Sequence, residues 1–150
     1  MKFKFLSHTA DIKFQAFGNS LEECFENAGY ALVNIMCKEK IKPLSRKIIK
    51  VRGRDRGSLL YNFLEEFLYL LEVGGFVVGE IKNIKIKSSY KIKNEKKLYD
   101  MELTAEVFGD SLENYSIEGG VKAITYNDMF IKEIIEDKKK KFICQVVVDV

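Results

Sequence analysis

The sequence predicts a single α+β domain over residues 1–150, in which a mostly antiparallel sheet is covered by two amphipathic helices in a two-layer arrangement. The 150 residues, with a hydrophobic content of 47%, are enough for one core and short for two. Two segments carry apolar residues at the three- and four-residue spacing of a helix. Several others alternate apolar and polar residues as strands do.

Two short strands are expected near the N-terminus, at residues 3–5 and 12–16, because apolar residues alternate with polar ones in both. The apolar positions are odd-numbered in the first segment and even-numbered in the second. The chain must therefore break its pairing between them, and the small polar segment 7–11 suits a bend.

Two helices follow from the apolar periodicity. The first should begin at about Leu21, with Ser20 as its cap and Glu23 completing a capping box. The second runs from residue 58 to 71, carries a wide aromatic stripe, and ends at the glycine pair 74–75. A stripe of that width predicts that this helix lies across a sheet.

Five further segments have strand character: 46–51, 84–92, 99–107, 129–135 and 142–150. Turns at 94–97 and 136–141 would join the last four into two antiparallel hairpins. Residues 115–127 fit either a strand or a short helix.

Lysines are concentrated on one face of the first hairpin and in the run 138–141. The hairpin lysines are suited to an RNA backbone or, alternatively, to ion pairs across the hairpin. These lysines and the acids opposite them are Lys85, Lys87, Lys91, Lys93, Asp100, Glu102 and Glu106. The run 138–141 reads as a solvated turn or as a binding site. The net charge of +3 is a modest bias towards polyanions.

Several reaction classes have little support in the residues. His8 is the only histidine, and the three widely spaced cysteines form neither a C-x-x-C pair nor an even set, which favours a reducing, cytoplasmic setting. Glu65 and Glu66 diverge by about 100° on a helix, so they cannot face each other as a catalytic pair. The sequence contains neither of the glycine-rich phosphate-binding motifs, G-x-x-x-x-G-K-[ST] and G-x-G-x-x-G. We expect no signal peptide and no membrane span.

Carboxylates gather at the two ends of the chain. Asp11 lies in the polar bend, and Asp149 is followed only by Val150 with its terminal carboxylate. If the first and last strands are neighbours, these oxygens meet and would favour a hard divalent cation such as Ca²⁺ or Mg²⁺. The alternative is that Asp149 extends into water at a chain end.

Five sequence blocks resemble the archease family: Ser7–Ile12 (SHTADI), Ser20–Phe25 (SLEECF) followed by Ala28, Leu59–Glu66 (LLYNFLEE), Val121–Tyr126 (VKAITY) and Val148–Val150 (VDV). The blocks occur in family order along residues 7–150. One departure is Asn127, where the family often has histidine, and we assign no role to that position.

The resemblance implies that the chain is not an enzyme itself but a protein cofactor of the RtcB-type tRNA-splicing RNA ligase. It would promote ligase guanylylation and multiple turnover, and would meet tRNA indirectly through the ligase. The family's divalent-cation site, usually described with Ca²⁺, matches Asp11, Asp149 and Val150. Lys122, in the V-K-A block, would support the ligase's chemistry or its docking. The alternative is that Lys122 is an ordinary surface lysine. The hypothesis is that a metal-bound acidic tip enters the ligase active site.

Two other functions stay open at this stage. An RNA-binding or chaperone-like module acting on tRNA-processing proteins would bind RNA without the ligase, in a salt-sensitive manner, through the hairpin lysines. A small metal-dependent hydrolase using the same carboxylates would turn over a phosphoester alone, although a second acid or base group is lacking.

Overall fold

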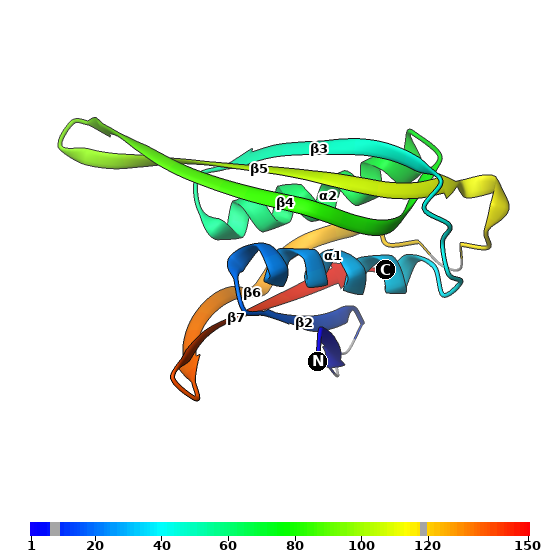
Figure 1. The fold of residues 1–150 in the computed structure, drawn as a ribbon, viewed down its shortest axis with the longest axis horizontal. Helices are drawn as coiled ribbons and strands as arrows, with labels where there is room; N and C mark the ends of the chain where they lie inside the picture. Colours follow the sequence, from blue (N-terminus) through cyan, green and yellow to red (C-terminus); the bar gives the residue numbers. More distant parts are fainter. Residues whose placement is uncertain (7–9, 118–119) are drawn as a thin grey trace.

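The computed structural model describes residues 1–6, 10–117 and 120–150, and within them the α+β prediction is confirmed. The described part contains two α-helices, one 3₁₀-helix and seven strands (Figure 1). In chain order these are β1 (Phe3–Leu6), β2 (Ile12–Gly18), α1 (Leu21–Met36), β3 (Ser45–Gly53), α2 (Arg56–Glu72), β4 (Phe76–Lys93), β5 (Lys96–Ser111), η1 (Leu112–Asn114), β6 (Ala123–Glu136) and β7 (Lys139–Asp149).

The strands form two sheets, which corrects the expectation of one sheet in a two-layer arrangement. A four-stranded sheet has the order β1-β2-β7-β6, and a three-stranded sheet has the order β3-β5-β4. All neighbouring strands are antiparallel. Figure 1 shows both helices between the two sheets, so the order of layers is sheet, helices, sheet.

The helices can lie between two sheets because they are apolar on more than one side. On α1, the Cys24 thiol donates to the carbonyl of Ala16 in β2, 3.4 Å away. On another side of the same helix, Gly29 is in close contact with Ile81 of β4 and Phe67 of α2. A single amphipathic stripe would have served one sheet only.

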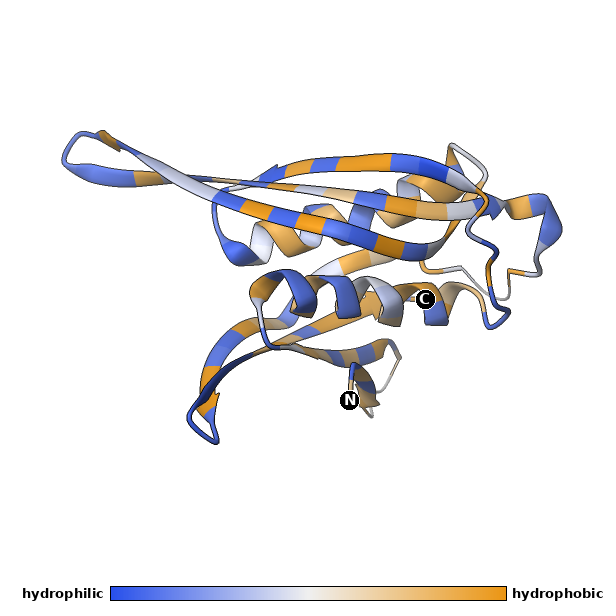
Figure 2. Cartoon of the chain, viewed as in Figure 1, coloured by the Kyte–Doolittle hydropathy of each residue, from blue (hydrophilic) through white to orange (hydrophobic). Residues whose placement is uncertain are grey.

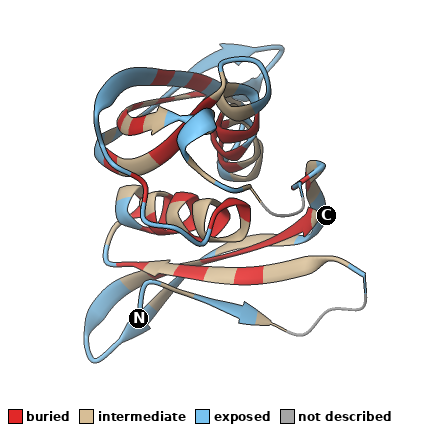
Figure 3. Ribbon diagram, turned by 90° about the vertical axis from the view of Figure 1, so that its right-hand side faces the viewer, coloured by how far each residue is buried: buried red, intermediate tan, exposed pale blue. Residues whose placement is uncertain are grey.

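The core is continuous from one sheet to the other through the helices. Phe14, Phe25, Phe63 and Phe67 are almost fully buried and come from β2, α1 and α2. Apolar and polar residues alternate along the strands in Figure 2, and the buried positions concentrate on the helices and the strand faces that meet them in Figure 3. Burial of these side chains is the main favourable contribution to folding.

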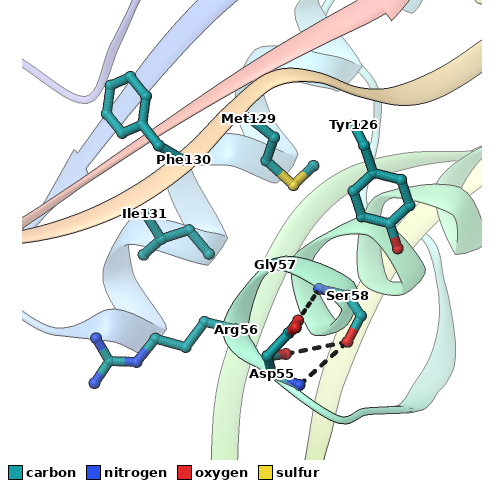
Figure 4. A pocket seen from close by; sticks show the side chains of 8 residues that line it. All are labelled: Asp55, Arg56, Gly57, Ser58, Tyr126, Met129, Phe130 and Ile131. Atoms are coloured by element: carbon teal, nitrogen blue, oxygen red, sulfur yellow. Dashed lines mark hydrogen bonds between the residues drawn. The ribbon is translucent and has the colours of Figure 1, made fainter.

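Both helices begin at capped positions. The Glu23 amide donates to Ser20 Oγ at 3.1 Å, which confirms the predicted cap of α1. The return bond from the Glu23 side chain that would complete the predicted capping box is not found among the described residues. The second helix begins at Arg56, two residues before the predicted start, because Asp55 is its cap. The Ser58 amide donates to Asp55 Oδ1 at 2.7 Å, and the Asp55 amide donates back to Ser58 Oγ at 3.2 Å, a full capping box (Figure 4).

The β4–β5 hairpin is longer than predicted because β4 begins at Phe76 and not at residue 84. Its first half contains two register shifts, between Val78 and Glu80 and between Lys82 and Lys85. Such bulges change which face a side chain points to, so the simple alternation is absent there. Beyond the second shift the ladder is regular, and the hairpin extends past the rest of the molecule (Figure 1).

The segment that the sequence left open, 115–127, is partly strand. Strand β6 begins at Ala123 and pairs with β7, whereas the described residues from 115 to 122 belong to no regular element. No helix in the described ranges is both long and apolar enough to cross a membrane.

Replacing Gly53 with alanine should destabilise the protein. A Cβ at Gly53 would lie 2.6 Å from the amide nitrogen of Leu59, so the start of α2 would have to shift. We expect a loss of about 1–3 kcal/mol, typical of overpacking, and a lower melting temperature by calorimetry.

The matched control is Gly57→Ala in the first turn of the same helix. The nearest atom to a Cβ there is Asp55 Oδ1 at 3.6 Å, an ordinary contact. This variant should keep or raise the melting temperature, since alanine favours a helix by roughly 0.5–1 kcal/mol over glycine. Equal melting temperatures for the two variants would contradict the packing at Gly53.

Candidate functional site

Strands β2, β7 and β6 bring three predicted site residues to one end of the four-stranded sheet. Ile12 pairs with Val148 at this end of the ladder. Asp11 lies in the bend directly before β2, and Asp149 is the last residue of β7, so each is the chain neighbour of one member of that pair. Ala123 of β6 pairs with Asp149 on its other side. The second strand and the last strand are thus neighbours, whereas the first strand, β1, lies on the other side of β2.

We call Asp11, Asp149 and the Val150 carboxylate the acidic edge. Asp11 and Asp149 are half-buried, and Val150 is exposed. Lys13 lies on the same sheet face as the two aspartates, but its ion pair, at 3.3 Å, is with Asp128. Across the described ranges, no three or more His, Cys, Asp or Glu side chains group as a metal site. The assignment of the acidic edge as a cation site therefore stays a prediction.

Lys122 is tied to the acidic edge through its backbone. Its amide donates to the carbonyl oxygen of Asp149 at 2.7 Å, next to the buried side chain of Val121. The lysine side chain is exposed and lines a cavity of about 240 Å³ between β6 and α2. Glu65 and Glu72 of α2 line the same cavity. Lys122 thus lies between the acidic edge and the acidic side of α2.

A bulge in β6 places Tyr126 against α2. The register of β6 against β7 shifts between Thr125 and Phe130, so the residues between them leave the ladder. Two bonds hold this bulge: Thr125 Oγ1 donates to the Val147 carbonyl at 2.8 Å, and the Gln145 side-chain amide donates to the Asp128 carbonyl at 2.8 Å. The bulge carries Tyr126 next to the start of α2 (Figure 4).

Tyr126 stacks on Tyr61 of α2, with ring centroids 4.4 Å apart and planes 8° from parallel. Sequence reasoning missed this pair, because the two tyrosines are far apart in the chain and each is unremarkable in its own element. The available signal was that each lies in one of the two blocks that carry the family resemblance, Leu59–Glu66 and Val121–Tyr126. The structure brings these two blocks together.

The tyrosine pair lies in an acidic environment. Burial and the nearby Glu65 carboxylate raise the pKa of Tyr61 above its usual value. Burial, together with the charges of Asp55 and Glu65, raises the pKa of Tyr126. Burial and the neighbouring Glu65 also raise the pKa of Glu66. All of these shifts favour the neutral form of the group, as expected where carboxylates gather.

The cysteines are poorly placed for nucleophilic chemistry. Cys24, Cys37 and Cys144 are buried and form no disulfide. A hydrogen bond with Cys24 and burial raise the pKa of Cys144 well above its usual value, so its thiolate is disfavoured. His8, the partner considered for a cysteine dyad, lies outside the described residues, as do Ser7 and Thr9 of the first block.

The fold and the site together define an α+β protein with helices between two antiparallel sheets, in which the start of β2 and the end of β7 lie at one end of the four-stranded sheet. The chain belongs to the Archease protein family, whose family model matches residues 3–150.

Individual relatives agree with this assignment along nearly the whole chain. Protein archease of Methanosarcina barkeri is 36% identical over 152 residues, covering 99% of this chain and 96% of the relative. Protein archease of Pyrococcus abyssi is 34% identical over 154 residues, covering 99% of each. The solution structure of Methanobacterium thermoautotrophicum protein 1598 is similar with a TM-score of 0.70 at 29% identity, covering 99% of this chain and 98% of that one.

Replacing Glu65 with glutamine should lower the pKa of Tyr61, because the carboxylate that disfavours the phenolate is removed. Titration of the tyrosine ring signals by NMR would measure it. Since folding raises this pKa, its contribution to stability is present below a pH of about 10 and is lost as the pH rises further. Glu66→Gln is the control, because Glu66 is not among the causes of the Tyr61 shift. An equal effect of both variants would contradict this assignment.

Proposed function

We propose that this chain is an accessory activator of an RtcB-type tRNA-splicing RNA ligase. It promotes ligase guanylylation and multiple turnover, and it acts through the acidic edge with a bound divalent cation. The observation that carries the proposal is the pairing of β2 with β7, which brings Asp11 and Asp149 to the same end of adjacent strands. Membership of the Archease family supports the same function.

The donor set at the acidic edge is suited to a hard cation. The side chains of Asp11 and Asp149 and the carboxylate of Val150 offer only oxygen, which Ca²⁺ prefers over nitrogen or sulfur. Asp149 forms no ion pair with any residue in the parts of the chain that the structure describes. Asp11, Asp149 and Val150 would hold the ion, which would supply positive charge for phosphate or carboxylate groups of the ligase site.

Rigid support makes the acidic edge suitable for insertion into another protein's active site. Val146, Val147 and Val148 are fully buried immediately before Asp149, so the strand cannot fray easily. The backbone bond from Lys122 fixes the other side of Asp149. A site on paired strands holds its groups more accurately than one on a free chain end.

Lys122 has a distinct part in this proposal. Its backbone supports Asp149, while its exposed side chain is available to a nucleotide phosphate or a carboxylate of the ligase. The stacked tyrosines beside it form a rigid, partly exposed surface against which the ligase packs. Aromatic side chains are common at such contacts because they bring large contact area at low entropy cost.

Asp149→Asn should reduce the stimulation of ligase guanylylation by at least tenfold, because even outer-shell changes at metal sites cost roughly 10–100-fold. The assay is transfer of labelled GMP to the cognate ligase, with and without chelator. Asp137→Asn is the matched control. It removes the same charge at the far end of β7, at a residue with φ of 53°, which asparagine tolerates. Full stimulation by a folded Asp149→Asn protein would contradict the proposal.

Ca²⁺ should raise the melting temperature of the protein alone. At a concentration 100 times the dissociation constant, binding adds about 2.7 kcal/mol to stability. For a domain of this size, that corresponds to roughly 5–10 °C in calorimetry. Asp11→Asn should lose most of the rise and Asp137→Asn should keep it. A rise of the same size in the Asp11 variant would place the ion elsewhere.

A further inference from the structure

We propose that the protein also contacts RNA directly, through the end of the molecule opposite the acidic edge. The surface consists of the outer part of the β4–β5 hairpin, residues 87–99, which we call the arm, and the groove beneath it. The choice of RNA as the polyanion rests in part on the proposed function. The observations that indicate a polyanion site, which are the charge and shape of the surface, are independent of that function.

The arm carries more positive charge than the sequence suggested. Ion pairs between its lysines and the acids of β5 were one expectation, but Glu102 instead pairs with Arg52 at 3.2 Å and Lys50 at 3.9 Å on β3. Asp100 also pairs with Arg52, at 3.6 Å. In the described part of the chain, the lysines of the arm form no ion pair. These are Lys87, Lys91, Lys93, Lys96 and Lys97.

The arm also exposes aromatic rings. Tyr90 and Tyr99 are a cross-strand pair with centroids 5.9 Å apart, and they are 53% and 50% exposed. Lys97 lies over the Tyr90 ring at 4.7 Å. Lys97 shares the face of these rings, whereas Lys87, Lys91, Lys93 and Lys96 alternate onto the opposite face of the two-stranded arm. Exposed rings and lysines together suit single-stranded nucleic acid, because bases stack on rings while phosphates attract cations.

A groove of about 630 Å³ lies beneath the arm. Tyr99 and Ser88 line it from the arm, Arg56 from the start of α2, and Lys140 from the start of β7. Glu22 is the one carboxylate among the described residues that line it. Figure 1 shows the two hairpins, β4–β5 and β6–β7, extending towards the same side with the start of α1 between them. Lys140 and Lys141 are paired with Glu133 and Glu136, at 2.9 and 3.6 Å, so the positive charge beside the groove comes mainly from the arm and Arg56. A polynucleotide strand could therefore lie between the two hairpins, against the arm.

Hydroxyl groups in the groove favour RNA over DNA. Ser88 and Tyr99 each carry a hydroxyl that can donate and accept a hydrogen bond. The ribose 2′-hydroxyl is the group that distinguishes RNA from DNA at a protein surface. These two side chains are the ones we expect to contact it.

The test is binding of a labelled single-stranded RNA of about 15 nucleotides to the full chain, without ligase, by fluorescence anisotropy. The arm variant is Lys93→Glu with Lys97→Glu, which changes one lysine on each face of the arm. Its affinity should fall at least tenfold at about 50 mM salt, and its dependence of log affinity on log salt should be shallower by about 1.4, or 0.7 for each phosphate that is no longer neutralised. Tyr99→Ala should also weaken binding, whereas Tyr99→Phe should keep the stacking but reduce the preference for RNA over DNA, because it lacks the hydroxyl that contacts the ribose 2′-hydroxyl.

The matched control is Lys40→Glu with Lys42→Glu, in the exposed segment after α1, which makes the same change in net charge away from the arm. It should change affinity by less than about twofold. An equal loss of RNA affinity in both double variants would show that binding depends only on the net charge of the protein, and this would overturn the proposal. So would wild-type binding to the matched DNA as tight as to RNA.

Failure of this RNA-binding proposal can be distinguished from failure of the proposed ligase function. The arm variant should still stimulate guanylylation in an assay without RNA, because the acidic edge is unchanged. If the wild-type chain binds no RNA, or if the arm variant instead loses association with the ligase protein, the arm is a protein contact and the proposal is wrong.

Discussion

The pairing of β2 with β7 is the constraint on which the rest of the structure depends. It joins the two ends of the chain through seven paired positions, from Ile12 with Val148 to Gly18 with Phe142. The inward side chains of this pair, including Phe14, Cys144 and Val146, are fully buried beneath α1. Because a shift of one residue would turn those side chains outward, burial fixes the register strongly. The same register places Ile12 opposite Val148, the chain neighbours of Asp11 and Asp149.

The close approach of the helices to both sheets depends on small residues at the contacts. A Cβ at Gly29 would lie 2.6 Å from Ile81, and one at Gly18 would overlap the backbone of Cys24. Polar bonds complete the contact: the buried side chain of Asn27 donates to the Phe17 carbonyl at 2.7 Å. The helices therefore set the distance between the sheets, and with it the position of α2 against β6, where Tyr61 meets Tyr126.

Much of the local structure was predictable from the sequence, and the errors have identifiable physical causes. The helix α1 with its Ser20 cap, the strand β3 and the two hairpin turns follow from periodicity and capping chemistry alone. The early part of β4 and the bulge in β6 did not follow, because register shifts remove the alternation on which prediction depends. The division into two sheets depends on strand order, which short-range patterns do not contain.

The candidate site could be predicted only in part from the sequence, because short-range patterns do not show which distant segments meet. Asp11, Asp149, Val150 and Lys122 come from the resemblance and from the carboxylates near the chain ends. The structure pairs Ile12 with Val148 and joins the Lys122 amide to the Asp149 carbonyl, and the cation site itself stays a prediction. The stacked tyrosines and the pairing of the β5 acids with β3 depend on contacts between distant segments. Without that pairing, the arm lysines would be neutralised across their own hairpin.

Strand β7 gives the molecule two chemically different ends. It runs from Lys139 to Asp149, which at the rise of an extended strand is about 30 Å. One end carries the oxygen-rich acidic edge, and the other carries the basic β6–β7 turn and faces the groove beneath the arm. Over such a distance, salt screens the two charge sets from each other, since the Debye length is about 8 Å at physiological ionic strength. A rigid protein with its charges separated in this way can hold a divalent cation at one end and bind a polyanion at the other without either contact weakening the other. Under the proposed function, that separation would let the protein stay on an RNA–ligase complex while its acidic edge enters the catalytic site.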